Sequence, residues 1–173
     1  GKPLGKPSNA VAARKQLEAL NGRTHEILTG LCVVGPAYFA AAAATTLAVV
    51  FAGTFLLART MAPVHGPAPA WLAVLASIGA SPILYYITVL PLMSHGLTFG
   101  FTAITVALTL RAERSGGAGA WAWCGAALGL TVLCRTQAAV LALFVLAGLW
   151  RSRASVRHAA ITAVSAFAVF SPQ

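Results

Sequence analysis

The distribution of acidic side chains constrains this chain more than any other feature. Its 173 residues include no aspartate, and beyond residue 26 the only carboxylate side chain is Glu113. Hydrophobic residues make up 58% of the chain and charged residues only 9%. The polar groups are too few to cover the surface of a water-soluble globule. The sequence therefore predicts that lipid surrounds most of the chain.

The composition changes near residue 34. Before it, Ser8 is a candidate N-cap for an amphipathic helix over 10–20, and the pattern over 24–34 is typical of a strand. We therefore expect a short soluble α/β piece at 1–34 and a transmembrane helical region at 35–173. The chain opens without Met and stops after an apolar run, which indicates a fragment of a longer protein. We expect the join near residue 34 to be artificial or recent; the alternative is a real fusion of the two parts.

The apolar runs after residue 34 are separated by Pro, Gly and charged residues. Isolated strands would leave backbone groups unpaired in hydrocarbon, so the expected fold class is all-α, a polytopic transmembrane helical bundle. Runs near 15 residues are shorter than the roughly 20 that cross a bilayer, which predicts half-helices or segments that pair across a cavity. The six predicted segments are 35–58, 69–91, 96–110, 118–134, 136–150 and 156–171.

The arginines predict an orientation. If the segments alternate in direction, Arg135 lies on one side and six arginines on the other, namely Arg59, Arg111, Arg114, Arg151, Arg153 and Arg157. The positive-inside rule makes the six-arginine side cytoplasmic. This rule also accounts for the net charge of +9, so we expect membrane lipids as partners, no nucleic acid, and an integral protein of a bacterial plasma membrane.

The N-terminal residues carry a recognisable series of motifs. Gly5-Lys6-Pro7, an Ala-rich helix ending at Leu20 and the run from Asn21 to Gly30 resemble the Maf family of nucleoside triphosphate pyrophosphatases. The resemblance implies that Lys6 contacts nucleotide phosphates; the plainer interpretation is a solvated loop lysine. It also implies that the metal-binding carboxylates lie elsewhere in the family's fold, so we expect no cofactor and no hydrolysis here, and a divalent metal only in a full-length protein.

A second resemblance lies in the apolar region. The runs Ser81 to Tyr86, Leu92 to Gly96 and Cys134 to Gln137, with Trp123 to Gly125 and Gly129-Leu130, resemble the polytopic C-type glycosyltransferases (GT-C), such as protein O-mannosyltransferase and aminoarabinose transferase relatives. The resemblance implies a parent enzyme that moves a sugar from a polyprenyl-phosphate donor to an outer-face acceptor. Its catalytic aspartate precedes the first residue of this chain, so we expect no transferase activity from the chain alone.

Three residues are the candidates for a donor-lipid phosphate site or sugar groove. A guanidinium suits a partly desolvated phosphate, which favours Arg135; the alternative is an arginine that simply ends a helix. His95 is either a phosphate donor or a polar turn residue. Tyr85, with Tyr86, either lines the groove or anchors the chain at a membrane interface.

Other features have structural interpretations. Cys32, Cys124 and Cys134 have no ligand spacing and are expected to be small buried hydrophobes. Gly125 and Gly129 predict a close helix contact. Two alternative functions stay open: a Maf-type pyrophosphatase fragment fused to membrane sequence, and a polytopic transporter fragment.

Overall fold

The computed structural model describes residues 9–20, 36–90 and 93–171. The chain divides into two units, residues 1–34 and 35–173, which are described separately. Every regular element in the described residues is a helix. The strand predicted over 24–34 lies outside these residues, and so do Ser8, Lys6 and Cys32.

The first unit contributes one described helix, α1 (Ala10–Leu20), with the bounds that the sequence predicts. Asn9 caps it, because its Oδ1 accepts the backbone N–H of Ala12 at 2.8 Å. Arg14 donates from Nε to Oε1 of Glu18 one turn later, at 3.0 Å. This pair is exposed on both sides and therefore adds little stability.

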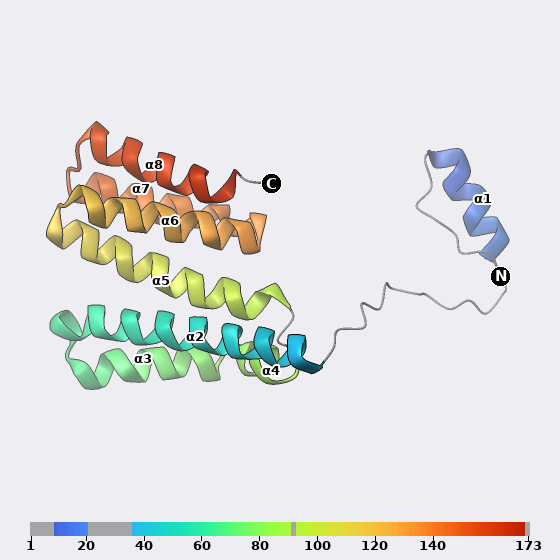
Figure 1. Ribbon diagram of the computed structural model, residues 1–173, viewed down its shortest axis with the longest axis horizontal. Helices are drawn as coiled ribbons and strands as arrows, with labels where there is room; N and C mark the ends of the chain where they lie inside the picture. The colour runs from blue at the N-terminus through green and yellow to red at the C-terminus, as the bar shows by residue number, and fades with distance from the viewer. Residues whose placement is uncertain (1–8, 21–35, 91–92, 172–173) are drawn as a thin grey trace. The chain divides into compact units, whose positions relative to one another are not determined.

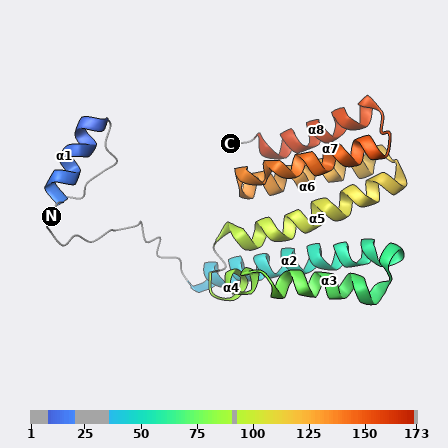
Figure 2. The same ribbon diagram turned by 180° about the vertical axis from the view of Figure 1, so that it is seen from behind.

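The second unit is a bundle of helices that reverse direction along the chain. Helix α5 lies between α2 and α6, α3 packs beside α2, and α8 packs closely on α6 (Figures 1 and 2). The elements are α2 (Pro36–His65), α3 (Pro67–Gly79), α4 (Ile83–Thr88), α5 (Ser94–Ser115), α6 (Ala118–Cys134), the 3₁₀ helix η1 (Thr136–Val140), α7 (Leu141–Arg151) and α8 (Val156–Phe170).

Two glycines make the sharp reversals. Gly66 has φ +86°, which only glycine adopts freely, and α3 starts at the next residue, Pro67. The predicted break from Arg59 to Pro69 was therefore wrong: α2 continues through Pro63 to His65. Gly116, at φ +63°, ends α5 and donates its N–H to the carbonyl of Ala112.

Close helix contacts depend on residues without bulky side chains. A Cβ on Gly53 would lie 2.3 Å from the carbonyl oxygen of Gly100, so α2 and α5 touch through two glycines. A Cβ on Gly125 would lie 2.2 Å from the carbonyl oxygen of Thr162, which brings α6 against α8. The close contact predicted from the Gly125 and Gly129 spacing is confirmed, and it forms within one chain.

The largest buried side chain is Trp121, which has no exposed surface and packs among α5, α6 and α7. Buried threonines bond the carbonyl one turn earlier, as Thr109 does to Thr105 at 2.8 Å. Thr105 and Thr131 also join α5 to α6 through their hydroxyls at 3.1 Å. In the described residues, no buried side-chain nitrogen or oxygen lacks a partner, so this interior carries no unpaired polar group.

The predicted fold class needs a correction. The described residues are all-α, but only Ala37–His65 is both long and apolar enough to cross a membrane, with mean hydropathy 2.0, so the prediction of six spans was wrong. The segment predicted over 69–91 breaks between α3 and α4, where Pro82 precedes Ile83. Helices α6 and α8 have 17 and 15 residues and are too short for about 30 Å of hydrocarbon.

Candidate functional site

Three side chains from separate elements meet at one end of the bundle. The guanidinium of Arg135, just after α6, contacts the ring of His95 in the first turn of α5, with Nη1 within hydrogen-bond distance of Nδ1. The His95 ring stacks on Tyr86 of α4 with centroids 4.2 Å apart and planes 24° apart. Because an arginine only donates, this contact is a hydrogen bond in the tautomer whose Nδ1 carries no proton.

A small pocket opens beside this cluster. Its volume is about 160 Å³, and its walls come from the α3–α4 turn, α4 and the first turns of α5: Ser81, Pro82, Ile83, Tyr86, His95 and Phe99. Ser81 donates its hydroxyl to the carbonyl of Ile78 at 3.3 Å. The pocket thus combines an aromatic wall with an imidazole that a guanidinium holds in place.

Among the described residues of the second unit, no acidic side chain pairs with Arg135. Glu113 is the only carboxylate side chain beyond residue 26, and it pairs with Arg151 through two bonds, one of them Nε to Oε2 at 3.1 Å. His95 and Glu113 lie 18 residues apart on α5, which is about 27 Å of helix. Among the described residues, the hydrogen-bond partner of the Arg135 guanidinium is therefore the His95 ring and not a carboxylate.

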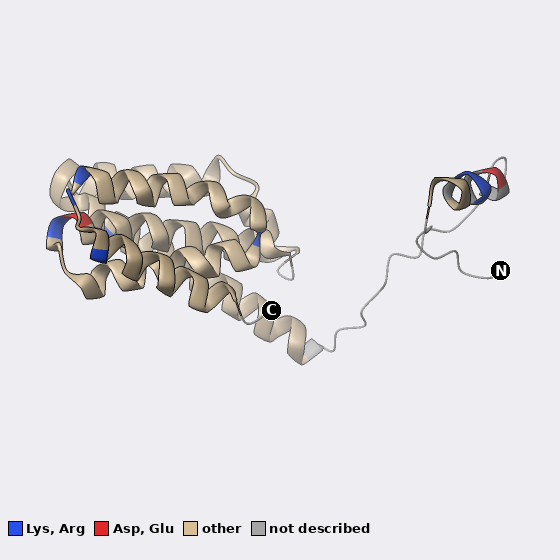
Figure 3. Cartoon of the chain, turned by 90° about the horizontal axis from the view of Figure 1, so that it is seen from above, with Lys and Arg blue, Asp and Glu red and all other residues tan. Residues whose placement is uncertain are grey.

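The six other arginines of the second unit lie at the opposite end of the bundle (Figure 3). Arg114 donates to the carbonyl of Thr60 at 2.9 Å, which joins the last turn of α5 to α2 beside Arg59. The ion pair with Glu113 holds Arg151 against α5 and raises the pKa of its guanidinium. This grouping agrees with the alternation predicted from the sequence.

The two described cysteines are free thiols in apolar surroundings. Burial raises the pKa of Cys124, and the hydrogen bond between its thiol and the Thr109 hydroxyl offsets only part of that effect. Burial also raises the pKa of Cys134. The expectation of a small buried hydrophobe is confirmed for Cys124, whereas Cys134 is only partly buried.

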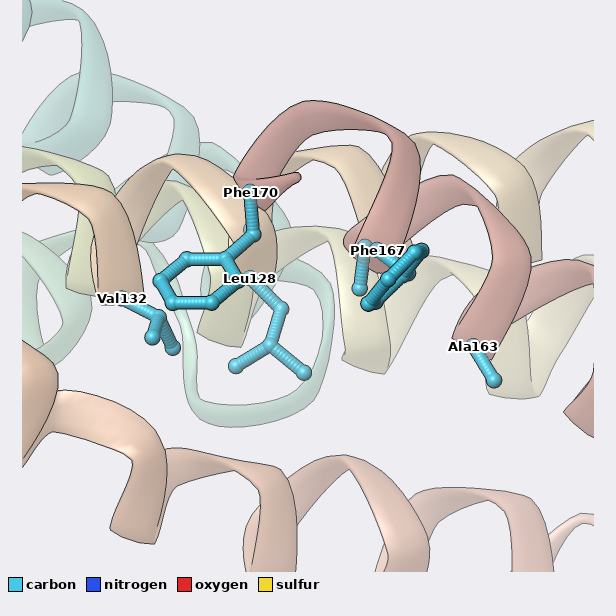
Figure 4. A pocket seen from close by; sticks show the side chains of 7 residues that line it. Leu128, Val132, Ala163, Phe167 and Phe170 are labelled. Atoms are coloured by element: carbon cyan, nitrogen blue, oxygen red, sulfur yellow. The ribbon is translucent and has the colours of Figure 1, made fainter. Parts of the chain in front are cut away.

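An apolar groove lies between α6 and α8 (Figure 4). It has a volume of about 260 Å³ and is lined by Leu128, Gly129 and Val132 of α6 and by Ala163, Ala166, Phe167 and Phe170 of α8. None of these side chains bears a polar group, so the groove offers shape and apolar surface only.

The described residues do not fit a metal ion. No group of three or more His, Cys, Asp or Glu residues among them is arranged to hold one. Glu18 is exposed and pairs with Arg14, and Glu113 pairs with Arg151. A divalent cation of the kind that Maf proteins use would need oxygen ligands that these side chains do not assemble.

The structure brings two of the three predicted site residues together. Arg135 and His95 are in contact although 40 residues separate them in the sequence. Tyr85 lies outside the pocket, half exposed, and meets Tyr86 edge-on at 5.7 Å. Sequence reasoning missed Ser81 and Phe99, and it missed the Glu113–Arg151 pair, which the scarcity of carboxylates could have indicated.

These observations define the second unit as an α-helical bundle with one polar cluster at each end. The comparisons with known proteins concern the first unit and the start of the second. The family described as Maf-like protein matches residues 2–55. A dTTP/UTP pyrophosphatase of Pyrococcus horikoshii is 56% identical over 34 residues, and one of Anaeromyxobacter dehalogenans is 58% identical over 33.

The matches cover a small share of each protein. They span 20% and 19% of this chain and 18% and 17% of the two relatives. The similarity is therefore to one short segment of a pyrophosphatase. No solved structure matches the chain.

The comparisons correct the functional prediction. The N-terminal resemblance to Maf proteins is supported, whereas nothing supports the resemblance to C-type glycosyltransferases, so the prediction of a membrane glycosyltransferase was wrong. That prediction rested on short motifs of Tyr, Gly and Arg in apolar sequence, which recur by composition alone. The polyprenyl-phosphate donor was implied by that resemblance and has no other support.

Proposed function

We propose that the N-terminal segment binds a nucleoside triphosphate in the manner of Maf-like pyrophosphatases, with Lys6 contacting the phosphates. The observation that carries this proposal is the identity of 53–58% over 33–34 residues with five dTTP/UTP pyrophosphatases. Sequence identity this high over so short a segment favours a shared phosphate-binding loop and helix over a chance match. Lys6 lies outside the described residues, so its role rests on the resemblance.

The composition separates binding from hydrolysis. A lysine ammonium can hold a triphosphate as a point charge, whereas Mg²⁺-assisted hydrolysis needs carboxylates to position the ion. This chain has three glutamates and no aspartate, and the two described glutamates are in ion pairs. We therefore expect binding of dTTP or UTP with little or no pyrophosphate release.

Lys2 provides a matched control, because Gly1-Lys2-Pro3 and Gly5-Lys6-Pro7 repeat the same tripeptide. Binding of fluorescent dTTP is measured for the full chain, Lys6→Gln and Lys2→Gln. A charge-assisted hydrogen bond contributes about 1.5–3 kcal/mol, so Lys6→Gln should weaken binding roughly 10-fold to 150-fold. Equal losses in the two variants, or no dTTP binding by the parent chain, would exclude the proposal.

A second candidate function is the binding of a small phosphate-bearing anion at Arg135. The specific observation in its favour is a partly buried guanidinium whose hydrogen-bond partner among the described residues is the His95 ring, while Glu113 lies about 27 Å from His95 along α5. An anion would supply the missing charge and would accept two hydrogen bonds from the planar guanidinium. The adjacent 160 Å³ pocket has room for a phosphate and a small substituent.

Calorimetric titration with inorganic phosphate tests this second proposal. Arg135→Gln should lose at least about tenfold in affinity, and Arg135→Lys should lose less because it keeps the charge without the bidentate geometry. Arg14→Gln, at an exposed arginine of α1, is the control and should bind like the parent chain. Equal binding by Arg135→Gln and Arg14→Gln would rule the site out.

A further inference from the structure

Six arginines gather at one end of the helical bundle, which we call the arginine end. They come from the last two turns of α2 and of α5, from the end of α7, from the α7–α8 turn and from the first turn of α8 (Figure 3). All six side chains are exposed. The arginine end consists of Arg59, Arg111, Arg114, Arg151, Arg153 and Arg157.

The positive charge of this end is almost uncompensated. Glu113 is the only carboxylate side chain of residues 35–173, and it pairs with Arg151. The other five arginines therefore have no acidic partner among the residues that the structure describes in this unit. Arg114 bonds the Thr60 carbonyl and Arg59 lies over the Phe55 ring at 5.7 Å, so these two are held near neutral groups.

Large apolar side chains stand exposed between these charges. Trp150, which precedes Arg151, is 87% exposed, and Val156, which precedes Arg157, is also 87% exposed. Val64, in the last turn of α2, is 62% exposed. A surface that alternates arginine with an exposed tryptophan fits the boundary between lipid headgroups and hydrocarbon, where tryptophan concentrates.

A third observation distinguishes lipid from other anionic partners. The one helix of the described residues that is long and apolar enough to cross a membrane, Ala37–His65, reaches the arginine end with its C-terminal turns. Only 22% of its most apolar stretch is buried inside the protein. A nucleic acid or an acidic protein would neutralise the arginines but would leave the exposed Val64, Trp150 and Val156 of this end in water.

We propose that the arginine end binds the surface of an anionic lipid bilayer. The guanidinium groups contact headgroup phosphates, and Trp150 and Val156 enter the interfacial layer between them. This binding does not depend on the nucleotide proposal, because it uses no residue of the first unit.

Flotation of the full chain with vesicles tests the proposal. The probes are vesicles of phosphatidylcholine alone and vesicles in which about 30% of the lipid is phosphatidylglycerol. The chain should prefer the anionic vesicles, and the preference should shrink as the salt concentration rises, because salt screens exposed charges. Equal binding to the two kinds of vesicle would overturn the proposal.

The variants localise the binding. Arg153→Gln combined with Arg157→Gln should lower binding to anionic vesicles roughly 25-fold, about fivefold for each arginine. Arg14→Gln combined with Lys15→Gln removes the same charge from α1 and should change binding little. If both double variants lose affinity equally, only net charge matters and the arginine end is not the binding surface.

Trp150→Ala tests the apolar contact with the bilayer separately from the charge of the arginines. It should weaken binding to both kinds of vesicle without changing the salt dependence, because it removes apolar contact only. Unchanged binding by Trp150→Ala would contradict the interfacial role. Tighter binding of the chain to duplex DNA or to polyglutamate than to anionic vesicles at equal salt would identify a different partner and refute the lipid surface.

Discussion

Adding one methyl group at the contact between α6 and α8 should destabilise the bundle. In Gly125→Ala the new Cβ would lie 2.2 Å from the carbonyl oxygen of Thr162 and 3.0 Å from its Cα. An ordinary contact starts at about 3.4 Å, so the two helices must move apart by about 1 Å. The obstacle is backbone, which cannot rotate away as a side chain would.

Gly119→Ala is the matched control, because Gly119 lies on the same helix and a Cβ there would meet nothing within 4 Å. Both substitutions gain the helix propensity of alanine over glycine, at most about 1 kcal/mol, and this gain cancels in the comparison. The remaining difference is the cost of overpacking, about 1–3 kcal/mol. For a chain of this size it corresponds to a Tm lower by roughly 2–12 °C in Gly125→Ala than in Gly119→Ala.

Thermal unfolding followed by far-ultraviolet circular dichroism measures the effect, with the parent chain in the same buffer. Gly129→Ala, whose Cβ would lie 2.5 Å from the carbonyl oxygen of Ala166, should behave like Gly125→Ala. A Tm for Gly125→Ala equal to or above that of Gly119→Ala would refute the close α6–α8 contact and the packing argument built on it.

Three further predictions concern the core, the ion pairs and the thiols. Trp121→Ala should lower the free energy of unfolding by about 3–5 kcal/mol, because Trp121 is fully buried. Trp123 is 70% exposed on the same helix, so Trp123→Ala should change it by less than about 0.5 kcal/mol. Equal effects of the two substitutions in denaturant unfolding would contradict the assigned core. Glu113→Gln should lower the Tm, because Arg151 loses its partner. Glu18→Gln breaks the exposed pair on α1 and should leave the Tm unchanged. A larger effect of Glu18→Gln than of Glu113→Gln would show that the Glu113 pair is not formed. With Cys32 and Cys134 replaced by alanine, Cys124 should react with a maleimide at pH 8 much more slowly than an unfolded thiol, because its raised pKa reduces the thiolate fraction. The same raised pKa should make the free energy of unfolding fall as the pH rises above about 9. Rapid labelling of the folded chain would exclude the burial of Cys124.

The positions of several helices could be predicted from the sequence because local signals mark their ends. Helix α1 and helix α6 have the predicted bounds, 10–20 and 118–134, and charged or glycine-rich runs flank both. The end of α2 was misjudged, because Pro63 and Arg59 looked like breaks while the actual reversal needs only the positive φ of Gly66. Helix length, which decides whether a run can span a membrane, depends on such single positions.

The candidate site was predicted in pieces. Arg135 and His95 each attracted attention as ionisable residues in apolar sequence, and their contact follows from the antiparallel packing of α5 and α6. The choice between Tyr85 and Tyr86 could not be made from two adjacent aromatic residues. It depends on the direction in which the short helix α4 presents each ring, and the structure places Tyr86 on His95.

The sequence by itself determined the helical character of the second unit, the scarcity of carboxylates and the similarity of the first unit to Maf proteins. Each of these features follows from the composition or from a contiguous motif. Only the tertiary structure decided which helices touch, that one helix of the described residues is both long and apolar enough to cross a membrane, and that Glu113 balances one arginine while Arg135 meets a histidine. The physical reason is that these outcomes depend on close approach between backbones at glycines and on contacts between residues far apart in the chain, and neither has a local signal.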